Sequence, residues 1–171
     1  RLLGMHFFKP VPVMRSVEVI RPTHADEKFV GPAMAWLKKI GKSPARCKDV
    51  AGFIVNRVAR PLLLSAARLI EAGRGTPATI DHALVRQAGF PMGPFQMLDF
   101  AGLPEEFTIS EIVYEALGKP ERLKPTALES KLIARGCRGR ANARGYYVYG
   151  ENPPGTVNPV VAELVPGYAE R

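Results

Sequence analysis

Apolar and polar residues at the start of the chain follow patterns that predict two neighbouring strands. Leu2 to Phe8 is a short apolar run with two aromatic residues, and Ser16 to Ile20 alternates polar with apolar residues. Both patterns are typical of strands. Pro10 and Pro12 lie between them and favour an extended connection without regular strand pairing. The two strands can therefore lie side by side.

The next residues complete the pattern of an α/β unit. Glu27 to Ile40 is amphipathic, carries Lys38 and Lys39 in its last turn and is followed by Gly41, as expected for a helix and its C-terminus. Pro44 to Lys48 then reads as a short strand. We therefore interpret residues 1–48 as the last strands and helix of an α/β domain, and the chain as part of a larger protein.

From residue 49 the apolar positions recur with helical spacing. The predicted helices cover residues 51–72, 76–88, 94–100, 106–117 and 126–135. Successive helices with short connections predict an all-α domain over residues 49–150. Residues 151–171 are rich in proline, and we expect a flexible tail with little order there. The predicted fold class is thus mainly α, an all-helical domain preceded by a truncated Rossmann-type α/β region.

The composition is that of an ordinary globular protein, with 171 residues of which 46% are hydrophobic. No apolar run approaches the roughly 20 residues of a membrane span, and no signal peptide pattern opens the chain. Because Cys47 and Cys137 are the only cysteines, a disulfide framework is not expected and a reducing cytoplasm is the simplest compartment. The formal charge of +8 suits nucleic acid, a phosphate-rich cofactor such as coenzyme A, or merely a solvated basic surface.

A histidine and a glutamate are the candidate catalytic residues. His6 and Glu18 each lie among apolar residues, where an ionisable side chain is costly to place without a partner. If the two predicted strands pair, the carboxylate can accept a hydrogen bond from one imidazole nitrogen and leave the other free as a base. The alternative is a structural histidine in an apolar strand, and spacing alone does not decide between the two.

Three motifs together resemble the 3-hydroxyacyl-CoA dehydrogenase family. They are GMHFFKPVPVMRSVEVI from Gly4, GFIVNRV from Gly52 and GFPMGPFQMLDFAGL from Gly89. The resemblance implies reversible oxidation of a 3-hydroxyacyl-CoA with NAD as hydride acceptor. It also implies that His6 is the general base, that Glu18 orients it, and that Asn56 helps to hold the substrate oxygen.

One position departs from the family pattern. Lys9 stands where the family usually has asparagine, in the motif HFFNP. Its ammonium can contact a phosphate or the thioester of an acyl-CoA, or turn to solvent, and we include Lys9 among the candidate substrate-binding residues. Asp99 is either functional or a structural carboxylate in a cap or an ion pair.

The sequence does not provide the usual NAD-binding residues. No G-x-G-x-x-G follows a strand anywhere in the chain, so we assign no cofactor-binding residue and expect NAD to be held by an N-terminal domain outside these residues. The chain alone is therefore expected to be inactive. No His, Cys, Asp or Glu cluster has metal-ligand spacing, and no metal is predicted.

The segment Arg135 to Arg144, with the sequence RGCRGRANAR, is the strongest run of charge. It could be an RNA-binding arginine-glycine segment, although it occurs once and does not repeat. In the resembling family this region ends the helical domain, but Asn142 and Ala143 replace the usual threonine and glycine. We expect no nucleic-acid partner and no membrane partner.

Two other functions stay open at this point. The helical region could be a dimerisation module with a vestigial site, because apolar helices commonly associate through a symmetric interface. The protein could also be a related dehydrogenase that acts on a small hydroxy acid. With either the family function or the first alternative, we expect a homodimer formed through the helical domain.

Overall fold

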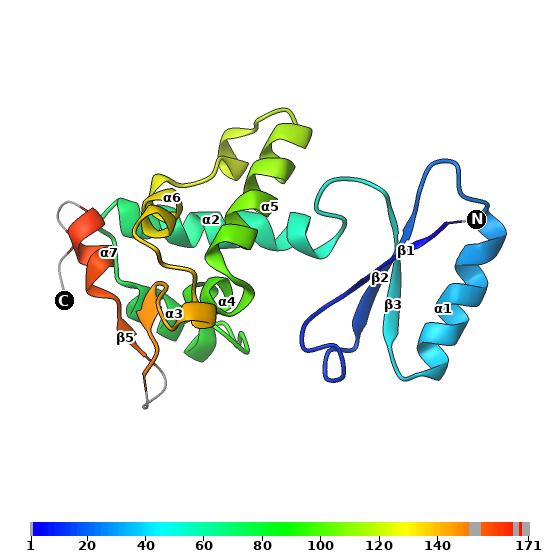
Figure 1. Cartoon of the computed structure of the whole chain (residues 1–171), viewed down its shortest axis with the longest axis horizontal. Coiled ribbons are helices and arrows are strands. Elements are labelled where there is room, and N and C mark those ends of the chain that lie inside the picture. The colour runs from blue at the N-terminus through cyan, green and yellow to red at the C-terminus, as the bar shows by residue number, and fades with distance from the viewer. Residues whose placement is uncertain (1, 151–154, 166–167, 169–171) are drawn as a thin grey trace. The chain divides into compact units, whose positions relative to one another are not determined.

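The computed structural model describes residues 2–150, 155–165 and 168, and the chain divides into two compact units, residues 1–57 and 58–171. The first unit contains a short three-stranded mixed sheet, and the second is built mainly of helices (Figure 1). The predicted fold class, mainly α with a short N-terminal α/β region, is confirmed. Whether the domain boundary falls after residue 48 stays a prediction.

The sheet of the first unit has β2 at its centre. β1 (Gly4–Phe7) pairs antiparallel with β2 (Ser16–Arg21), and β3 (Ser43–Lys48) pairs parallel with the other edge of β2. All three strands lie within or next to the predicted segments. In the register of β1 and β2, His6 lies directly opposite Glu18.

A helical crossover connects β2 to β3 and covers the sheet. The 3₁₀ turn η1 (Glu27–Phe29) is capped by the side chain of Asp26, which accepts a hydrogen bond from the backbone N–H of Lys28, and leads into α1 (Val30–Lys39). A parallel pair of strands needs such a crossover. The core between helix and sheet consists of Val17, Val19, Val30 and Leu37.

The second unit packs several helices around one main core. Its elements are α2 (Val55–Glu71), which begins in the first unit, α3 (Pro77–Arg86), α4 (Pro94–Ala101), α5 (Leu103–Ala116), η2 (Glu121–Leu123), α6 (Ala127–Ala134), η3 (Arg140–Asn142), β4 (Tyr147–Val148), β5 (Thr156–Val157) and α7 (Pro159–Leu164). Leu98, Leu103, Leu132 and the ring of Tyr146 lie fully buried in the core.

Local sequence explains where two of these helices begin. Thr76 caps α3 through a reciprocal pair of hydrogen bonds with Thr79, and Pro77 occupies the first helical position. Pro94 occupies the first helical position of α4, as Pro77 does in α3, and α4 begins there as predicted. The remaining free N–H groups at the start of α4 are satisfied by Asp81 of α3.

Helix α2 begins four residues later than predicted. The predicted start was residue 51, but residues 51–54 form turns and regular helix begins at Val55. Gly52 and Phe53 have φ angles of 73° and 42°, which lie outside the helical region. The apolar character of this stretch therefore reflects a tight turn before the helix rather than its first turn.

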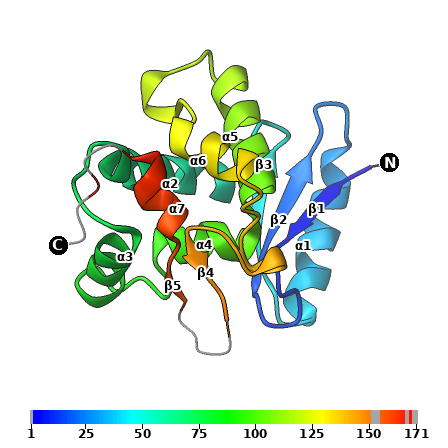
Figure 2. The ribbon, with the colours of Figure 1, turned by 60° about the vertical axis from the view of Figure 1, so that its left-hand side comes forward.

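The C-terminal segment is more ordered than predicted. We expected a flexible tail from residue 151, but β5 pairs with β4, and α7 buries Val160 and Val161 in the main core. This helix packs against α6 (Figures 1 and 2). Residues 151–154, 166, 167 and 169–171 of the predicted tail lie outside the described residues.

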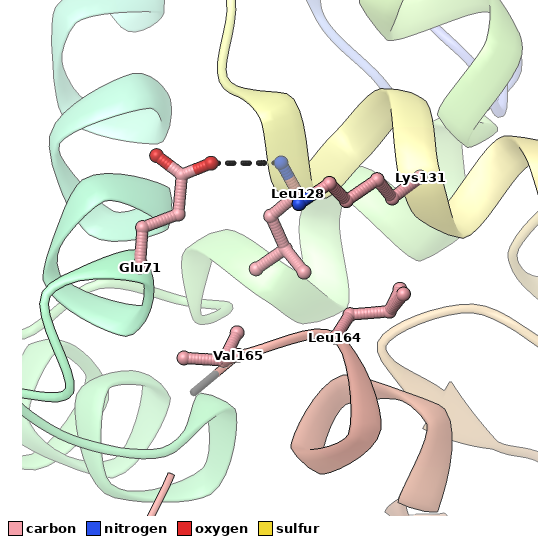
Figure 3. Close-up of a pocket in the computed structure, with 5 residues that line it drawn as sticks. All are labelled: Glu71, Leu128, Lys131, Leu164 and Val165. Carbon is pink, nitrogen blue, oxygen red and sulfur yellow. Dashed lines mark hydrogen bonds between the residues drawn. The ribbon is translucent and has the colours of Figure 1, made fainter. Parts of the chain in front are cut away.

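A glutamate at the end of α2 anchors α6 near this contact. The carboxylate of Glu71 accepts a hydrogen bond of 2.7 Å from the backbone N–H of Leu128, in the first turn of α6 (Figure 3). The same residues border a cavity of about 160 Å³ together with Lys131, Leu164 and Val165. Within the described part of the chain, no helix is long and apolar enough to cross a bilayer.

Candidate active site

The two predicted catalytic side chains meet across the first pair of strands. Nδ1 of His6 lies 2.6 Å from Oε2 of Glu18, so the imidazole N–H donates to the carboxylate. Glu18 is buried, whereas the His6 side chain keeps 34% of its surface exposed. Nε2 of His6 makes no hydrogen bond to any described residue. Glu18 therefore fixes Nδ1 of His6, and Nε2 stays available to a ligand.

The start of helix α2 holds the second oxygen of the glutamate. Oε1 of Glu18 accepts hydrogen bonds of 2.8 Å from the backbone N–H groups of both Ile54 and Val55. These groups have no partner within the helix, and the positive end of the helix dipole favours a carboxylate there. The left-handed conformation of Phe53 belongs to the turn that precedes these two N–H groups.

Two phenylalanine rings flank the histidine. The ring centroid of His6 lies 4.7 Å from that of Phe8 and 5.7 Å from that of Phe53, with interplanar angles of 57° and 53°. Sequence analysis missed these aromatic contacts and the two N–H groups that hold Glu18. Phe8 is next but one to His6, so its role has a local signal, whereas the contact with residues 53–55 depends on the tertiary fold.

The two candidate substrate-binding residues have different surroundings. Asn56 lies in the first turn of α2, one residue after Val55, and is partly exposed. Lys9 is exposed and follows β1. Among the described residues neither side chain forms a hydrogen bond or an ion pair, so both are available to a ligand. The substrate-binding role of each is still a prediction.

Asp99 has a structural environment in the second unit. Its carboxylate is buried and accepts hydrogen bonds from the backbone N–H groups of Tyr146 and Tyr147 and from the hydroxyl of Tyr149, at 2.8, 3.0 and 2.9 Å. Burial raises the pKa of Asp99 to about 6, against the lowering effect of these hydrogen bonds. With its acceptor positions occupied, Asp99 ties α4 to the β4 hairpin.

The remaining reactive side chains do not gather into a second site. Cys47 and Cys137 are free, and burial raises the pKa of each thiol, which disfavours the nucleophilic thiolate. His24 and His82 are exposed. The described residues contain no group of three His, Cys, Asp or Glu side chains placed to hold a metal ion.

The first unit lacks the features that hold a dinucleotide. A dinucleotide-binding strand-to-helix turn needs closely spaced glycines so that backbone N–H groups can reach the pyrophosphate. The connection from β2 to α1, residues 22–29, has no glycine. These residues therefore do not fit NAD by themselves.

Comparison with known proteins assigns both parts of the chain. The family model described as "3-hydroxyacyl-CoA dehydrogenase, NAD binding domain" matches residues 1–50, and the one described as "3-hydroxyacyl-CoA dehydrogenase, C-terminal domain" matches residues 52–149. The mitochondrial hydroxyacyl-coenzyme A dehydrogenase of Homo sapiens is 40% identical over 149 residues, which are 87% of this chain and 48% of that protein.

Bacterial relatives give the same result. The 3-hydroxybutyryl-CoA dehydrogenase of Mycobacterium tuberculosis is 37% identical over 150 residues, 87% of this chain and 52% of that protein. The crystal structure of (S)-3-hydroxybutyryl-CoA dehydrogenase from Ralstonia eutropha matches with a TM-score of 0.82 and 34% identity, over 87% of this chain and 52% of that chain.

The chain spans about half the length of the curated relatives it matches. Its three-stranded sheet corresponds to a short part of their NAD-binding domain, and its helices correspond to their C-terminal domain. Both family matches and both kinds of comparison lead to one assignment: the chain belongs to the 3-hydroxyacyl-CoA dehydrogenase family.

Proposed function

We propose that this chain provides the acid–base half of an NAD-dependent 3-hydroxyacyl-CoA dehydrogenase, which oxidises a 3-hydroxyacyl-CoA to the 3-ketoacyl-CoA. The observation that supports this most directly is the 2.6 Å hydrogen bond between His6 and the buried carboxylate of Glu18, which leaves Nε2 open. Family membership supports the substrate class, because the matched relatives act on 3-hydroxyacyl-CoA or 3-hydroxybutyryl-CoA by name.

The proposed proton transfer follows from the tautomer. With its proton on Nδ1 and donated to Glu18, His6 has a lone pair on Nε2 that can accept the proton of the substrate hydroxyl. The resulting imidazolium is stabilised by the adjacent carboxylate. A base placed in this way typically contributes about 10²- to 10⁴-fold to the rate. In the reverse direction the same imidazolium returns the proton to the substrate oxygen.

Glu18 is proposed to act as a positioning residue. Its two oxygens have separate partners, with His6 on one and the N–H groups at the start of α2 on the other. A carboxylate fixed in three directions cannot rotate away from the imidazole. The phenylalanine rings beside His6 restrict the ring further.

Asn56 and Lys9 are proposed to bind substrate. The side-chain amide of Asn56 can donate a hydrogen bond to the hydroxyl or keto oxygen, and the ammonium of Lys9 can bind a phosphate or the thioester oxygen. Their lack of partners within the described residues supports this role. The residues here do not form a dinucleotide cradle, so the hydride acceptor NAD requires binding groups beyond them.

The test is turnover of 3-hydroxybutyryl-CoA with NAD by the protein extended upstream to include a complete NAD-binding domain, compared with its His6→Gln variant. We expect the variant to lose at least about 100-fold in kcat/KM. His24→Gln, at an exposed histidine, is the matched control and should retain full activity. An inert parent, or a His6→Gln variant as active as the parent, would favour a helical dimerisation module with a vestigial site.

Substrate class is tested in the same assay. Free 3-hydroxybutyrate, without coenzyme A, should turn over far more slowly than its CoA ester, because contacts with the CoA group supply part of the binding energy. Equal turnover of the two substrates would favour a dehydrogenase of small hydroxy acids instead.

We further propose that two copies associate through the helical unit. The face of α2 opposite its buried side carries Val58, Leu62 and Leu69, and the side chains of Val58 and Leu69 are 72% and 41% exposed. This face and α3 enclose a mainly apolar groove of about 430 Å³. A helix that is apolar on opposite sides is usually buried on both.

The oligomeric state tests this interface. Sedimentation should give a dimer for the parent, and Leu62→Glu should shift it towards monomer because a charge would enter the contact. Ile112→Glu, at an exposed isoleucine of α5, is the control and should stay dimeric.

A cytoplasmic location also stays a proposal, supported by the two free cysteines, although the human relative is named as mitochondrial.

A further inference from the structure

An arginine side chain is buried in the second unit. Arg60 of α2 is 1% exposed, and its Nη1 donates to Oε2 and to the backbone carbonyl oxygen of Glu106, at 2.8 and 3.3 Å. The same nitrogen donates to the hydroxyl of Ser110 at 3.1 Å. Nε and Nη2 of Arg60 are also buried, and neither has a hydrogen-bond partner among the residues that the structure describes. Helix α5 therefore satisfies one nitrogen of the guanidinium and leaves the other two free.

A glutamate and a tyrosine have free polar atoms in the same interior. Glu129 of α6 is 2% exposed, and Tyr146, which precedes β4, is fully buried. Within the described part of the chain, neither Oε1 of Glu129 nor the hydroxyl of Tyr146 has a hydrogen-bond partner. Burial raises the pKa of both groups; the charge of Arg60 opposes this rise at Glu129, and the charge of Glu129 adds to it at Tyr146. The three side chains are thus electrostatic neighbours that no direct hydrogen bond joins.

The start of α6 does not use Glu129 as a helix cap. Thr126 and Glu129 have the spacing of a capping box, in which each side chain would bond to the backbone N–H of the other residue. In the described structure the side chain of Thr126 makes no such bond, and Glu71 of α2 accepts from the N–H of Leu128. The carboxyl group of Glu129 is therefore not tied to the helix end, and it lies buried in the interior.

We propose that Arg60, Glu129 and Tyr146 form a binding site for internal water. In this site a water molecule accepts from Nε–H or Nη2–H of Arg60 and donates to Oε1 of Glu129 and to the hydroxyl oxygen of Tyr146. Buried polar groups without a protein partner are commonly satisfied by water, and one buried water typically makes about three hydrogen bonds. The free atoms here include both donors and acceptors, which water can bridge.

The charge balance of the site favours water over an ion. Glu106 already forms an ion pair with Arg60 at 2.8 Å, so a bound anion would add an uncompensated negative charge to the interior. A cation would be repelled by the guanidinium. Burial raises the pKa of Glu129 to about 7, so below that pH its carboxyl group is mostly neutral. A small, neutral and polar ligand therefore fits the site best.

A high-resolution crystal structure of this chain is the direct test, and it does not depend on catalytic activity. We expect density for at least one water molecule about 2.7–3.2 Å from Nε or Nη2 of Arg60 and from Oε1 of Glu129. Direct contact between Glu129 and Arg60, without density between them, would overturn the proposal. A chloride ion at this position, recognised by its anomalous signal, would also overturn it.

Thermal melting of Tyr146→Phe is an independent test, made at about pH 6, below the pKa of Glu129 of about 7. A hydroxyl bonded to water stabilises the fold, so its loss should lower Tm by about 2–4 °C. A hydroxyl without any partner is costly to bury, so a higher Tm in Tyr146→Phe would contradict the site. Tyr114→Phe, at a half-buried tyrosine of α5, is the matched control and should leave Tm unchanged.

A double-variant cycle separates the bridging water from simple packing. Glu129→Leu removes one partner of the water and fills its place with an apolar side chain. In that background Tyr146→Phe should change Tm by less than about 1 °C, because the hydroxyl has already lost its bridge. If Tyr146→Phe lowers Tm equally in both backgrounds, the hydroxyl acts through packing alone and the proposal is wrong.

Discussion

Glu18 in the first unit and Asp81 in the second are buried carboxylates that hold the start of a helix. Glu18 accepts from two successive N–H groups at the start of α2, both at 2.8 Å. Asp81 accepts from the N–H groups of Phe95 and Gln96 at the start of α4, at 2.9 and 3.1 Å. Each carboxylate also has one side-chain partner, which is His6 for Glu18 and the hydroxyl of Tyr147 for Asp81.

The side-chain partner distinguishes a candidate catalytic group from a structural one. Tyr147 is buried, and burial together with the neighbouring Asp81 raises the pKa of its hydroxyl far above the ordinary value. That hydroxyl therefore stays protonated near neutral pH. His6, by contrast, has a partly exposed ring and an open Nε2 that can accept a proton. A helix cap becomes part of a candidate active site when its third partner can titrate and can be reached.

The contrast can be tested by replacing each carboxylate with its amide, and the largest effect is expected at Glu18. Glu18→Gln should reduce kcat/KM by about 10²- to 10⁴-fold in the complete protein, because an amide N–H facing Nδ1 favours the wrong tautomer. Its amide oxygen can still accept from α2, so folding should be nearly unchanged. Steady-state kinetics and thermal melting measure the two effects.

Asp81→Asn is the matched control for Glu18→Gln. It should leave kcat/KM of the folded protein unchanged and destabilise the second unit by about 1–2 kcal/mol, because one of three buried hydrogen bonds loses its acceptor. If Asp81→Asn reduced turnover as much as Glu18→Gln does, the distinction between the two carboxylates would be lost.

A second expected effect is a fall in stability with rising pH, caused by a buried glutamate that lacks a complete set of hydrogen-bond partners. Burial raises the pKa of Glu129 to about 7, with Glu106 and Glu71 adding to the rise and Arg60 opposing it. Between the ordinary value near 4.5 and about 7, the folded protein keeps a proton that the unfolded chain releases. Stability therefore falls as pH rises through this window.

Glu129→Gln mimics the protonated carboxyl and should remove this fall. The variant should be more stable than the parent at pH 8, by up to about 3 kcal/mol, and equal to it near pH 4. Glu111→Gln, at an exposed glutamate, should not differ from the parent at either pH. Denaturant unfolding at the two pH values measures the difference, and a variant less stable at pH 8 would contradict the assignment.

The smallest expected effect tests the rings beside the histidine. Phe8→Leu should lower kcat/KM by about three- to tenfold, because one aromatic contact of about 1 kcal/mol no longer restricts the imidazole. Steady-state kinetics measure this change. Phe90→Leu, at an exposed phenylalanine of the second unit, should leave kcat/KM unchanged.

The sequence indicated that His6 and Glu18 could pair across two strands, but it did not decide between a catalytic and a structural histidine. Two short strands separated by prolines, each with one ionisable residue among apolar ones, leave few arrangements that satisfy both groups, and the register of β1 and β2 brings them opposite each other. The positions of most helices followed from the spacing of apolar residues, and the start of α4 followed from Pro94.

Contacts between distant residues could not be predicted in this way. The N–H groups that hold Glu18 lie 36 and 37 residues further along the chain, and nothing in their side chains marks them. The order of the C-terminal segment was also missed, because prolines suggested disorder while Val160 and Val161 fill a core made by remote helices. In both cases tertiary packing decided what local patterns left open.

Helix α2 has a consequence for protein engineering. Its seventeen residues begin at the glutamate of the candidate site and end at Glu71, which anchors α6. The limit between the two compact units, after Arg57, falls inside its first turn. A chimera joined at that point would combine the N–H donors of one parent with the rest of helix α2 from another. Junctions for recombination between relatives are therefore better placed in the 49–51 segment, upstream of the turn that presents those donors.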